Sequence, residues 1–259
     1  MPPSSVSTHE ATARARVYSF LAEALSVHPD RERIGRVSEL AEDLGISRPG
    51  EASLGALEEE HMALFVVPGA RYVAPYESVF RDHWLLPAVL RPGSNPGETG
   101  TMIKGLVMGT STDQVRQSYL EAGIFPDAEL PDHIGNELRF MAHLWAREAD
   151  AGEEEAARLA DMREAFRRDH LLQWIRPLLA RVQENDRLGF YRVVLEIAAI
   201  VLESDSGCPD RGTELPQDDP VSRGSPLGGS QHPSPAPAAG HSGSDVGTCP
   251  YAAARRRQS

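Results

Sequence analysis

Residues 129–144, ELPDHIGNELRFMAHL, contain the clearest indication of secondary structure in this chain. Pro131 suits the first turn of a helix, and Asp132 stands where a carboxylate can accept the backbone N–H groups of that turn. Apolar residues then recur at intervals of four, three and four positions: Ile134, Leu138, Met141 and Trp145. A second, polar face carries Asp132, Asn136, Arg139 and His143. The pattern predicts a packed helix that presents charged groups on one side.

Comparable patterns predict helices along most of the chain. Their expected ranges are about 9–27, 30–44, 51–66, 99–108, 112–122, 131–150, 153–184 and 187–204. Pro177 is expected to kink or divide the helix 153–184. Two Pro- and Gly-containing stretches, Val67–Tyr76 and 91–97, predict loops on either side of the apolar segment Ser78–Leu90. Because no useful length alternates with a period of two, we expect an all-α single-domain helical bundle over residues 9–204.

Residues 205–259 differ in composition from the rest of the chain. Proline, glycine and serine account for 24 of these 55 residues. A segment of this kind cannot bury enough apolar surface to offset the entropy lost on ordering, so we expect a disordered C-terminal tail. Both cysteines, Cys208 and Cys249, lie in it, and their spacing indicates neither a disulfide framework nor a zinc site.

The charge and hydropathy of the chain exclude several classes of protein. A net charge of −12 argues against nucleic-acid binding, which requires a basic surface. The N-terminal residues lack the apolar region of a secretory signal. The most apolar stretch, Val193–Leu202, is too short to span a bilayer. We therefore expect a cytoplasmic protein that does not insert into membranes.

The residue patterns of common catalytic sites are absent from the sequence. It contains no phosphate-binding loop, no dinucleotide fingerprint and no GxSxG elbow. One alternative from the residues alone is a metal-binding helical-bundle enzyme that uses His61, His133, Glu137 and His143. A binding protein is the better interpretation, because the helical body also supplies residues typical of a peptide groove. These are Leu64, Phe65, Tyr72, Tyr76, Phe80 and Trp84, of which Leu64, Phe65 and Phe80 equally suit a hydrophobic core.

Four blocks of residues, in order, resemble the TorD/DmsD/NarJ family of cytoplasmic chaperones, which mature molybdenum enzymes of the DMSO reductase class. The first two are Tyr18–Ala22 with His28-Pro29, and Leu64-Phe65 with Pro68-Gly69 and Ala74–Phe80. The third joins Tyr119–Gly123 to Glu129–His133 and Glu137–Met141, and the fourth comprises Phe166–Leu171, Trp174 and Phe190-Tyr191. Together they span about residues 14–204, and the third block is the most specific.

The resemblance implies an all-helical chaperone without catalytic activity, sometimes a domain-swapped homodimer. Its partner would be the apo catalytic subunit of a molybdopterin-dependent oxidoreductase, including the subunit's twin-arginine signal peptide. The chaperone would hold no cofactor of its own and would retain its client until the client's cofactor is inserted. Proteins that reduce dimethyl sulfoxide, trimethylamine oxide, nitrate or selenate, or that oxidise hydrocarbons, all have such chaperones.

By the same resemblance, the peptide site comprises Leu64, Phe65, Pro75, Tyr76, Glu77, Ser78, Pro131, Asp132 and His133. Asp132, with Glu77, would pair with the guanidinium groups of the peptide, and the aromatic and leucine residues would contact its apolar region. His133 would orient Asp132 or donate to peptide carbonyl groups. His61 stands where some relatives carry an aromatic residue, and this difference bears on the peptide preferred.

Overall fold

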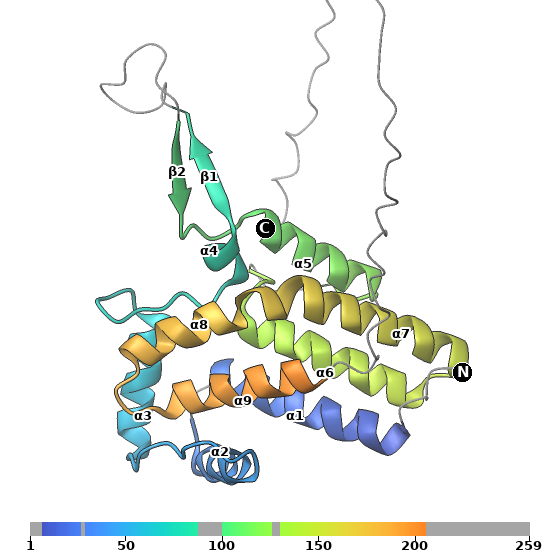
Figure 1. Cartoon of the computed structure of the whole chain (residues 1–259), viewed down its shortest axis with the longest axis horizontal. Coiled ribbons are helices and arrows are strands. Elements are labelled where there is room, and N and C mark those ends of the chain that lie inside the picture. The colour runs from blue at the N-terminus through green and yellow to red at the C-terminus, as the bar shows by residue number, and fades with distance from the viewer. Residues whose placement is uncertain (1–6, 27–28, 88–99, 126–129, 206–259) are drawn as a thin grey trace, which may run out of the picture. The chain divides into compact units, whose positions relative to one another are not determined.

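The computed structural model describes residues 7–26, 29–87, 100–125 and 130–205, and helices dominate this part of the chain (Figure 1). The expected all-α class is thereby confirmed. Residues 206–259 of the expected tail, with both cysteines, lie outside the described residues. None of the described helices is long and apolar enough to cross a membrane.

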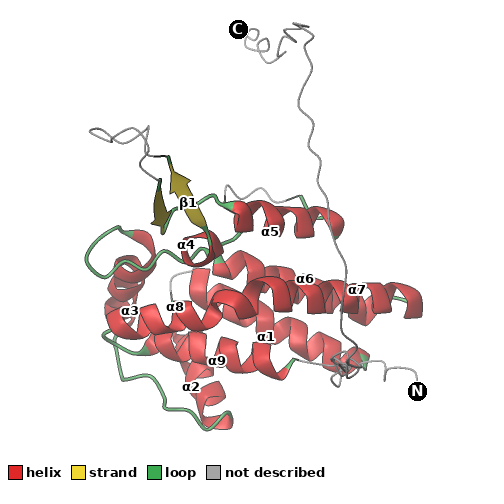
Figure 2. Cartoon of the chain, turned by 45° about the horizontal axis from the view of Figure 1, so that its top comes forward, coloured by secondary structure: helices red, strands yellow, loops and turns green. Residues whose placement is uncertain are grey.

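Figure 2 shows the helices and strands of the described residues, coloured by type. The α-helices are α1 (Thr8–Ser26), α2 (Arg31–Asp43), α3 (Leu54–His61), α4 (Glu77–Arg81), α5 (Thr110–Glu121), α6 (Ile134–Asp150), α7 (Glu153–Phe166), α8 (Leu172–Asn185) and α9 (Phe190–Ser204). Two π-helical turns, η1 (Met62–Val66) and η3 (Arg167–Leu171), continue α3 and α7. The strands are β1 (His83–Leu86) and β2 (Thr101–Lys104).

The core lies between α1, α6, α8 and α9. Helix α9 buries residues around most of its circumference, as expected for an apolar helix inside a bundle. Helices α1 and α6 form the most extensive pair, and Gly135 permits the close approach at the start of α6. A Cβ atom at Gly135 would collide with the side chain of Ser26 and approach the carbonyl of Ala22. The predicted apolar face of α6 is confirmed, since Ile134, Leu138, Met141 and Trp145 are all buried.

The expected long helix 153–184 is present as α7, η3 and α8 in succession. Pro177 lies inside α8 and does not divide it. The change in helical pitch occurs earlier, at the π-turn η3, which contains the buried residues Arg167, His170 and Leu171. A π-turn shifts the faces of the following helix, and such turns are frequent at functional sites.

The prediction of a helix over residues 99–108 is wrong. Residues Thr101–Lys104 form β2, which pairs antiparallel with β1. Within the apolar segment Ser78–Leu90, residues 78–81 belong to α4 and residues 83–86 form β1. Trp84 is opposite Ile103 and Leu85 is opposite Met102. β-branched and aromatic residues favour strands, but the pairing of segments this far apart has no local signature. In both views the hairpin projects from α4 away from the helices (Figures 1 and 2).

Asp205, which the composition placed in the tail, belongs to the folded domain. Its carboxylate is buried and accepts hydrogen bonds from the Tyr18 hydroxyl at 2.6 Å and the Trp145 indole N–H at 3.3 Å. Arg14 of α1 forms an ion pair with it. The last turn of α9 is therefore tied to α1 and α6 by polar contacts.

Candidate functional site

The two segments that the resemblance joins, residues 75–78 and 131–133, are in contact. Tyr76 and His133 form an isolated antiparallel β-bridge. The Glu77 N–H donates to the Asp132 carbonyl at 2.9 Å, and the Ile134 N–H donates to the Pro75 carbonyl at 3.0 Å. The start of α4 and the start of α6 are thus fixed to each other by main-chain hydrogen bonds.

Asp132 does not cap its own helix, contrary to the sequence-based expectation. Its Oδ2 accepts a hydrogen bond at 3.0 Å from the Ser78 N–H, in the first turn of α4. The side chain is completely buried. Its negative charge lies at the positive end of that short helix, where backbone N–H groups lack helical acceptors. Asp132 therefore has a structural contact that accounts for its position.

His133 is the residue that caps α6. Its Nδ1 accepts a hydrogen bond at 3.0 Å from the Gly135 N–H, so the proton of the neutral ring is on Nε2. Burial and, after it, the positive charge of the Arg139 guanidinium together lower the pKa of His133 to about 4. The imidazole is thus neutral at physiological pH. Its ring lies edge-on to Tyr76, with 5.3 Å between the centroids.

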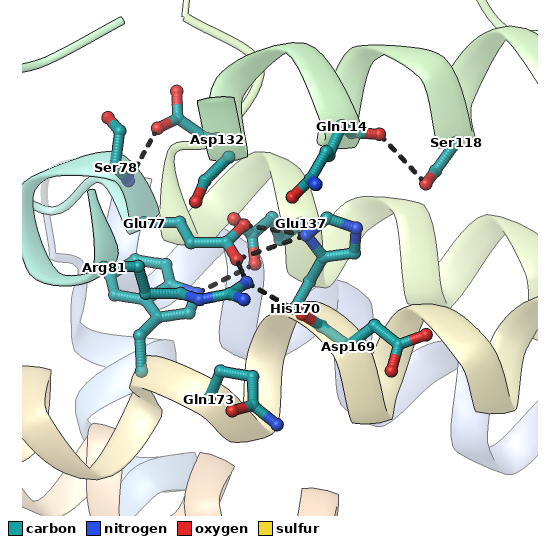
Figure 3. Close-up of polar contacts among 12 residues, drawn as sticks. Glu77, Ser78, Arg81, Gln114, Ser118, Asp132, Glu137, Asp169, His170 and Gln173 are labelled. Atoms are coloured by element: carbon teal, nitrogen blue, oxygen red, sulfur yellow. Dashed lines mark hydrogen bonds and ion pairs between the residues drawn. The ribbon is translucent and has the colours of Figure 1, made fainter. Parts of the chain in front are cut away.

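Charged side chains from α4, α6 and η3 form a largely buried network around Glu77 (Figure 3). The Glu77 carboxylate is within 2.9 Å of His170 Nδ1 and forms an ion pair with Arg81. Arg81 also donates to the Asp169 carbonyl at 2.7 Å. Glu77 therefore connects α4 to the π-turn η3 and is not available at the surface.

Glu137 of α6 lies in the same network. Its Oε2 accepts a hydrogen bond at 3.1 Å from the Trp174 indole N–H of α8. Burial raises the pKa of Glu137 well above its usual range, and the negative charge of Glu77 raises it further. The two causes act in the same direction, so both favour the neutral form of Glu137 in the folded protein. Sequence reasoning did not assign this role to Glu137, His170 or Trp174, although all three lie in the blocks that carry the family resemblance.

Most of the site residues expected from the sequence are buried. Glu77, Ser78 and Asp132 have no exposed surface, Pro75 and Pro131 are buried, and only Tyr76 and His133 are partly exposed. Leu64 and Phe65 belong to the core, where the Phe65 ring packs edge-on against Tyr191 at 5.2 Å. Of the two interpretations that the sequence allowed for Leu64 and Phe65, groove or core, the structure shows the core. The structure brings 75–78 and 131–133 together as a buried support, with Tyr76 and His133 toward the surface.

A groove that the sequence did not reveal lies along α3, η1 and the loop after η1. Its volume is about 730 Å³, within the range of ligand sites. Met62, Ala63 and Val67 supply apolar surface, and Glu58 and Glu59 are exposed along its side. The loop 67–76 leads from this groove to Tyr76.

The charges that line the groove leave a surplus of carboxylates. Neither Glu58 nor Glu59 forms an ion pair within the described part of the chain, and Arg187 provides one positive charge. Arg71 is neutralised by Glu60, at 2.6 Å. The groove therefore combines apolar surface with net negative charge.

The four residues of the metal-binding alternative do not form a ligand cluster. No group of three or more His, Cys, Asp or Glu residues in the described ranges is arranged to hold a metal ion. His133 Nδ1 is occupied by the Gly135 N–H, Glu137 is bonded to Trp174, and His143 faces a different hollow, between α1 and α6. His61 packs against Phe65 and Tyr191.

The described residues form a helical domain in which the segments 75–78 and 131–133 are joined. The sequence profile of the family described as "Nitrate reductase delta subunit" matches residues 29–180, more than half of the chain. The chain belongs to this family, which consists of molybdoenzyme maturation chaperones whose members interact with the catalytic subunit. A search of curated proteins found no match.

Proposed function

We propose that this protein is a chaperone for the apo catalytic subunit of a molybdoenzyme and binds the subunit's twin-arginine signal peptide in the groove along α3 and η1. Membership of the family supports the chaperone role. The observation that carries peptide binding is the chemistry of the groove, in which apolar side chains lie beside two carboxylates that form no ion pair with any residue the structure describes. Binding would take place in the cytoplasm, before cofactor insertion and export.

The two halves of such a peptide match the two parts of the groove. Exposed Glu58 and Glu59 would accept hydrogen bonds from the arginine guanidinium groups, and charge-assisted pairs of this kind are favourable when they are bidentate. The apolar region would contact Met62, Ala63 and the exposed Val67. From there the peptide can continue along the loop to Tyr76.

Asp132 and Glu77 have a supporting part in this proposal. Both carboxylates are buried and already bonded, so a direct contact with arginine would require the segment 75–78 to separate from 131–133. Their contribution is to hold the loop that ends the groove. This assignment replaces the direct pairing that the resemblance implied.

The test is the affinity for a synthetic peptide that contains two adjacent arginines followed by an apolar run. The double variant Glu58→Gln/Glu59→Gln should bind it about 3- to 10-fold more weakly, because two exposed ion pairs are lost. The matched control is Glu153→Gln/Glu154→Gln, which removes the same charge from exposed residues of α7. Equal affinities for the two double variants, measured by calorimetry, would show that the peptide does not bind in this groove.

A further inference from the structure

The β-hairpin exposes apolar side chains that no described element covers. Leu85 is 61% exposed, its cross-strand partner Met102 is 55% exposed, and Trp84 on the opposite face is 45% exposed. Exposed apolar side chains gathered on one element in this way mark interaction sites in folded proteins. An isolated two-stranded hairpin is also only marginally stable in water, so burying its apolar faces would stabilise it.

The exposed surface continues along the segment that follows β2. The residues Leu106, Val107 and Met108 are exposed as well. Met108 has a φ angle of 67°, in the left-handed region that is unfavourable for residues other than glycine. A strained backbone that presents an apolar side chain to solvent contributes nothing to the core and is typical of binding segments.

We propose that the hairpin binds an extended apolar segment of unfolded polypeptide, which aligns with the exposed strands. The two strands are the whole of this sheet within the described residues, so each has one edge without a paired strand. An extended peptide can add to such an edge through main-chain hydrogen bonds while its alternate side chains contact the apolar faces. Methionines such as Met102 and Met108 adapt to varied apolar sequences because their side chains are flexible and polarisable.

An unfolded segment fits the hairpin better than a second copy of this chain does. The six half-exposed side chains are divided between two faces of the hairpin, so either face offers less than the ~800 Å² per partner typical of a stable interface. Two copies would also bring together two chains of net charge −12. A small apolar surface suits transient contact with a chain that has not yet folded.

This inference goes beyond signal-peptide binding and concerns a different part of the molecule. The groove lies on α3 and η1, whereas the hairpin extends from α4. The probe for the hairpin is a peptide of alternating valine and threonine with two lysines at each end, which contains no arginine. The Glu58→Gln/Glu59→Gln variant should bind this probe like the unsubstituted protein, so either proposal can fail without the other.

Trp84 provides a direct readout of binding at the hairpin. The chain contains three tryptophans, and Trp145 and Trp174 are buried. The peptide should shift the fluorescence of Trp84 to shorter wavelength and protect it from acrylamide. A counterpart with prolines at two central positions should give little protection, because proline cannot donate to a strand ladder. Equal protection by both peptides would contradict pairing along the strand.

Paired variants then test the apolar surface itself. Leu85→Thr/Met102→Thr retains β-propensity while removing apolar area, and should weaken peptide binding about tenfold. The control Leu44→Thr changes an exposed leucine at the end of α2 and should leave binding unchanged. Unchanged affinity in the hairpin variant would overturn the proposal. So would protection of Trp84 that rises with protein concentration alone, together with a doubling of mass in sedimentation, since a second copy would then be the occupant.

Discussion

The Asp132 carboxylate accepts a hydrogen bond from the Ser78 N–H at 3.0 Å, so a residue that precedes α6 caps α4. Glu77 N–H donates to the Asp132 carbonyl at the same point. Through these two hydrogen bonds Asp132 fixes the start of α4 to the start of α6. Its main role is therefore structural.

Replacing Asp132 should therefore reduce stability as well as any client binding. Asp132→Ala removes the acceptor for the Ser78 N–H and should lower the free energy of unfolding by about 1–2 kcal/mol, the usual cost of losing a helix cap. Asp132→Asn keeps an acceptor oxygen and should cost less. Urea denaturation of both variants gives the comparison. A stable Asp132→Ala protein that no longer binds the arginine peptide would instead favour a direct contact with the peptide.

Glu137 and Glu77 should respond differently to the same substitution. Burial raises the pKa of Glu137, so the neutral Glu137→Gln side chain, which keeps an acceptor for Trp174, should change stability at pH 7 by less than about 1 kcal/mol. Glu77→Gln leaves Arg81 and His170 without their anionic partner and should cost about 2–4 kcal/mol. Denaturation at pH 7 distinguishes them. Equal losses in the two variants would mean that Glu137 is ionised in the folded state.

The raised pKa of Glu137 also predicts a dependence of stability on pH. A carboxyl group whose pKa is raised on folding binds its proton more tightly in the folded state. Its contribution to the free energy of unfolding is therefore complete below the pKa of the unfolded state, near 4.5, and is lost as pH rises through the pKa of the folded state. The Glu137→Gln variant has no titrating carboxyl group at this position, so it should not lose stability in this way as pH rises. The difference in unfolding free energy between the two proteins should thus change in favour of the variant as pH increases above 4.5.

His133 should produce the opposite dependence. Its pKa is lowered from 6.5 to about 4, so its contribution is present above pH 6.5 and is lost as pH falls toward 4. His133→Asn retains a side-chain acceptor for the Gly135 N–H but does not titrate. Relative to this variant, the unsubstituted protein should lose on the order of 2–3 kcal/mol between pH 7 and pH 4. Parallel stability curves for the two proteins would show that the imidazole is not shielded as the structure indicates.

The sequence was sufficient to predict the helices whose apolar residues repeat on one face. The helical spacing of apolar residues in α6 predicts one buried face, and the structure buries all four residues on it: Ile134, Leu138, Met141 and Trp145. That period reports burial of one helix face against the rest of the protein, and it needs no knowledge of the partner. The family resemblance assigned residues 75–78 and 131–133 to one peptide site, and the structure joins these two segments through the β-bridge between Tyr76 and His133.

The remaining features depend on partners that are distant in the sequence. The carboxylate of Asp132 could have capped either helix, and only the folded chain places the Ser78 N–H beside it. The hairpin is set by pairs such as Trp84 with Ile103, whose four-residue strands are too short for an alternating pattern to be recognised. The sequence alone also could not predict whether Leu64 is buried, because an apolar residue on a helix suits a core or a groove; the structure places it in the core.

Asp205 provides a test of where the folded domain ends. Its buried carboxylate accepts hydrogen bonds from Tyr18 and Trp145 and forms an ion pair with Arg14. Asp205→Ala would leave these three donors without their shared acceptor and should lower the free energy of unfolding by about 2–4 kcal/mol. The control is Asp43→Ala, at the C-terminal end of α2, where the carboxylate is exposed and a small change is expected. If chemical denaturation shows equal stabilities for the two variants, the contacts of Asp205 do not hold the end of α9 to α1 and α6.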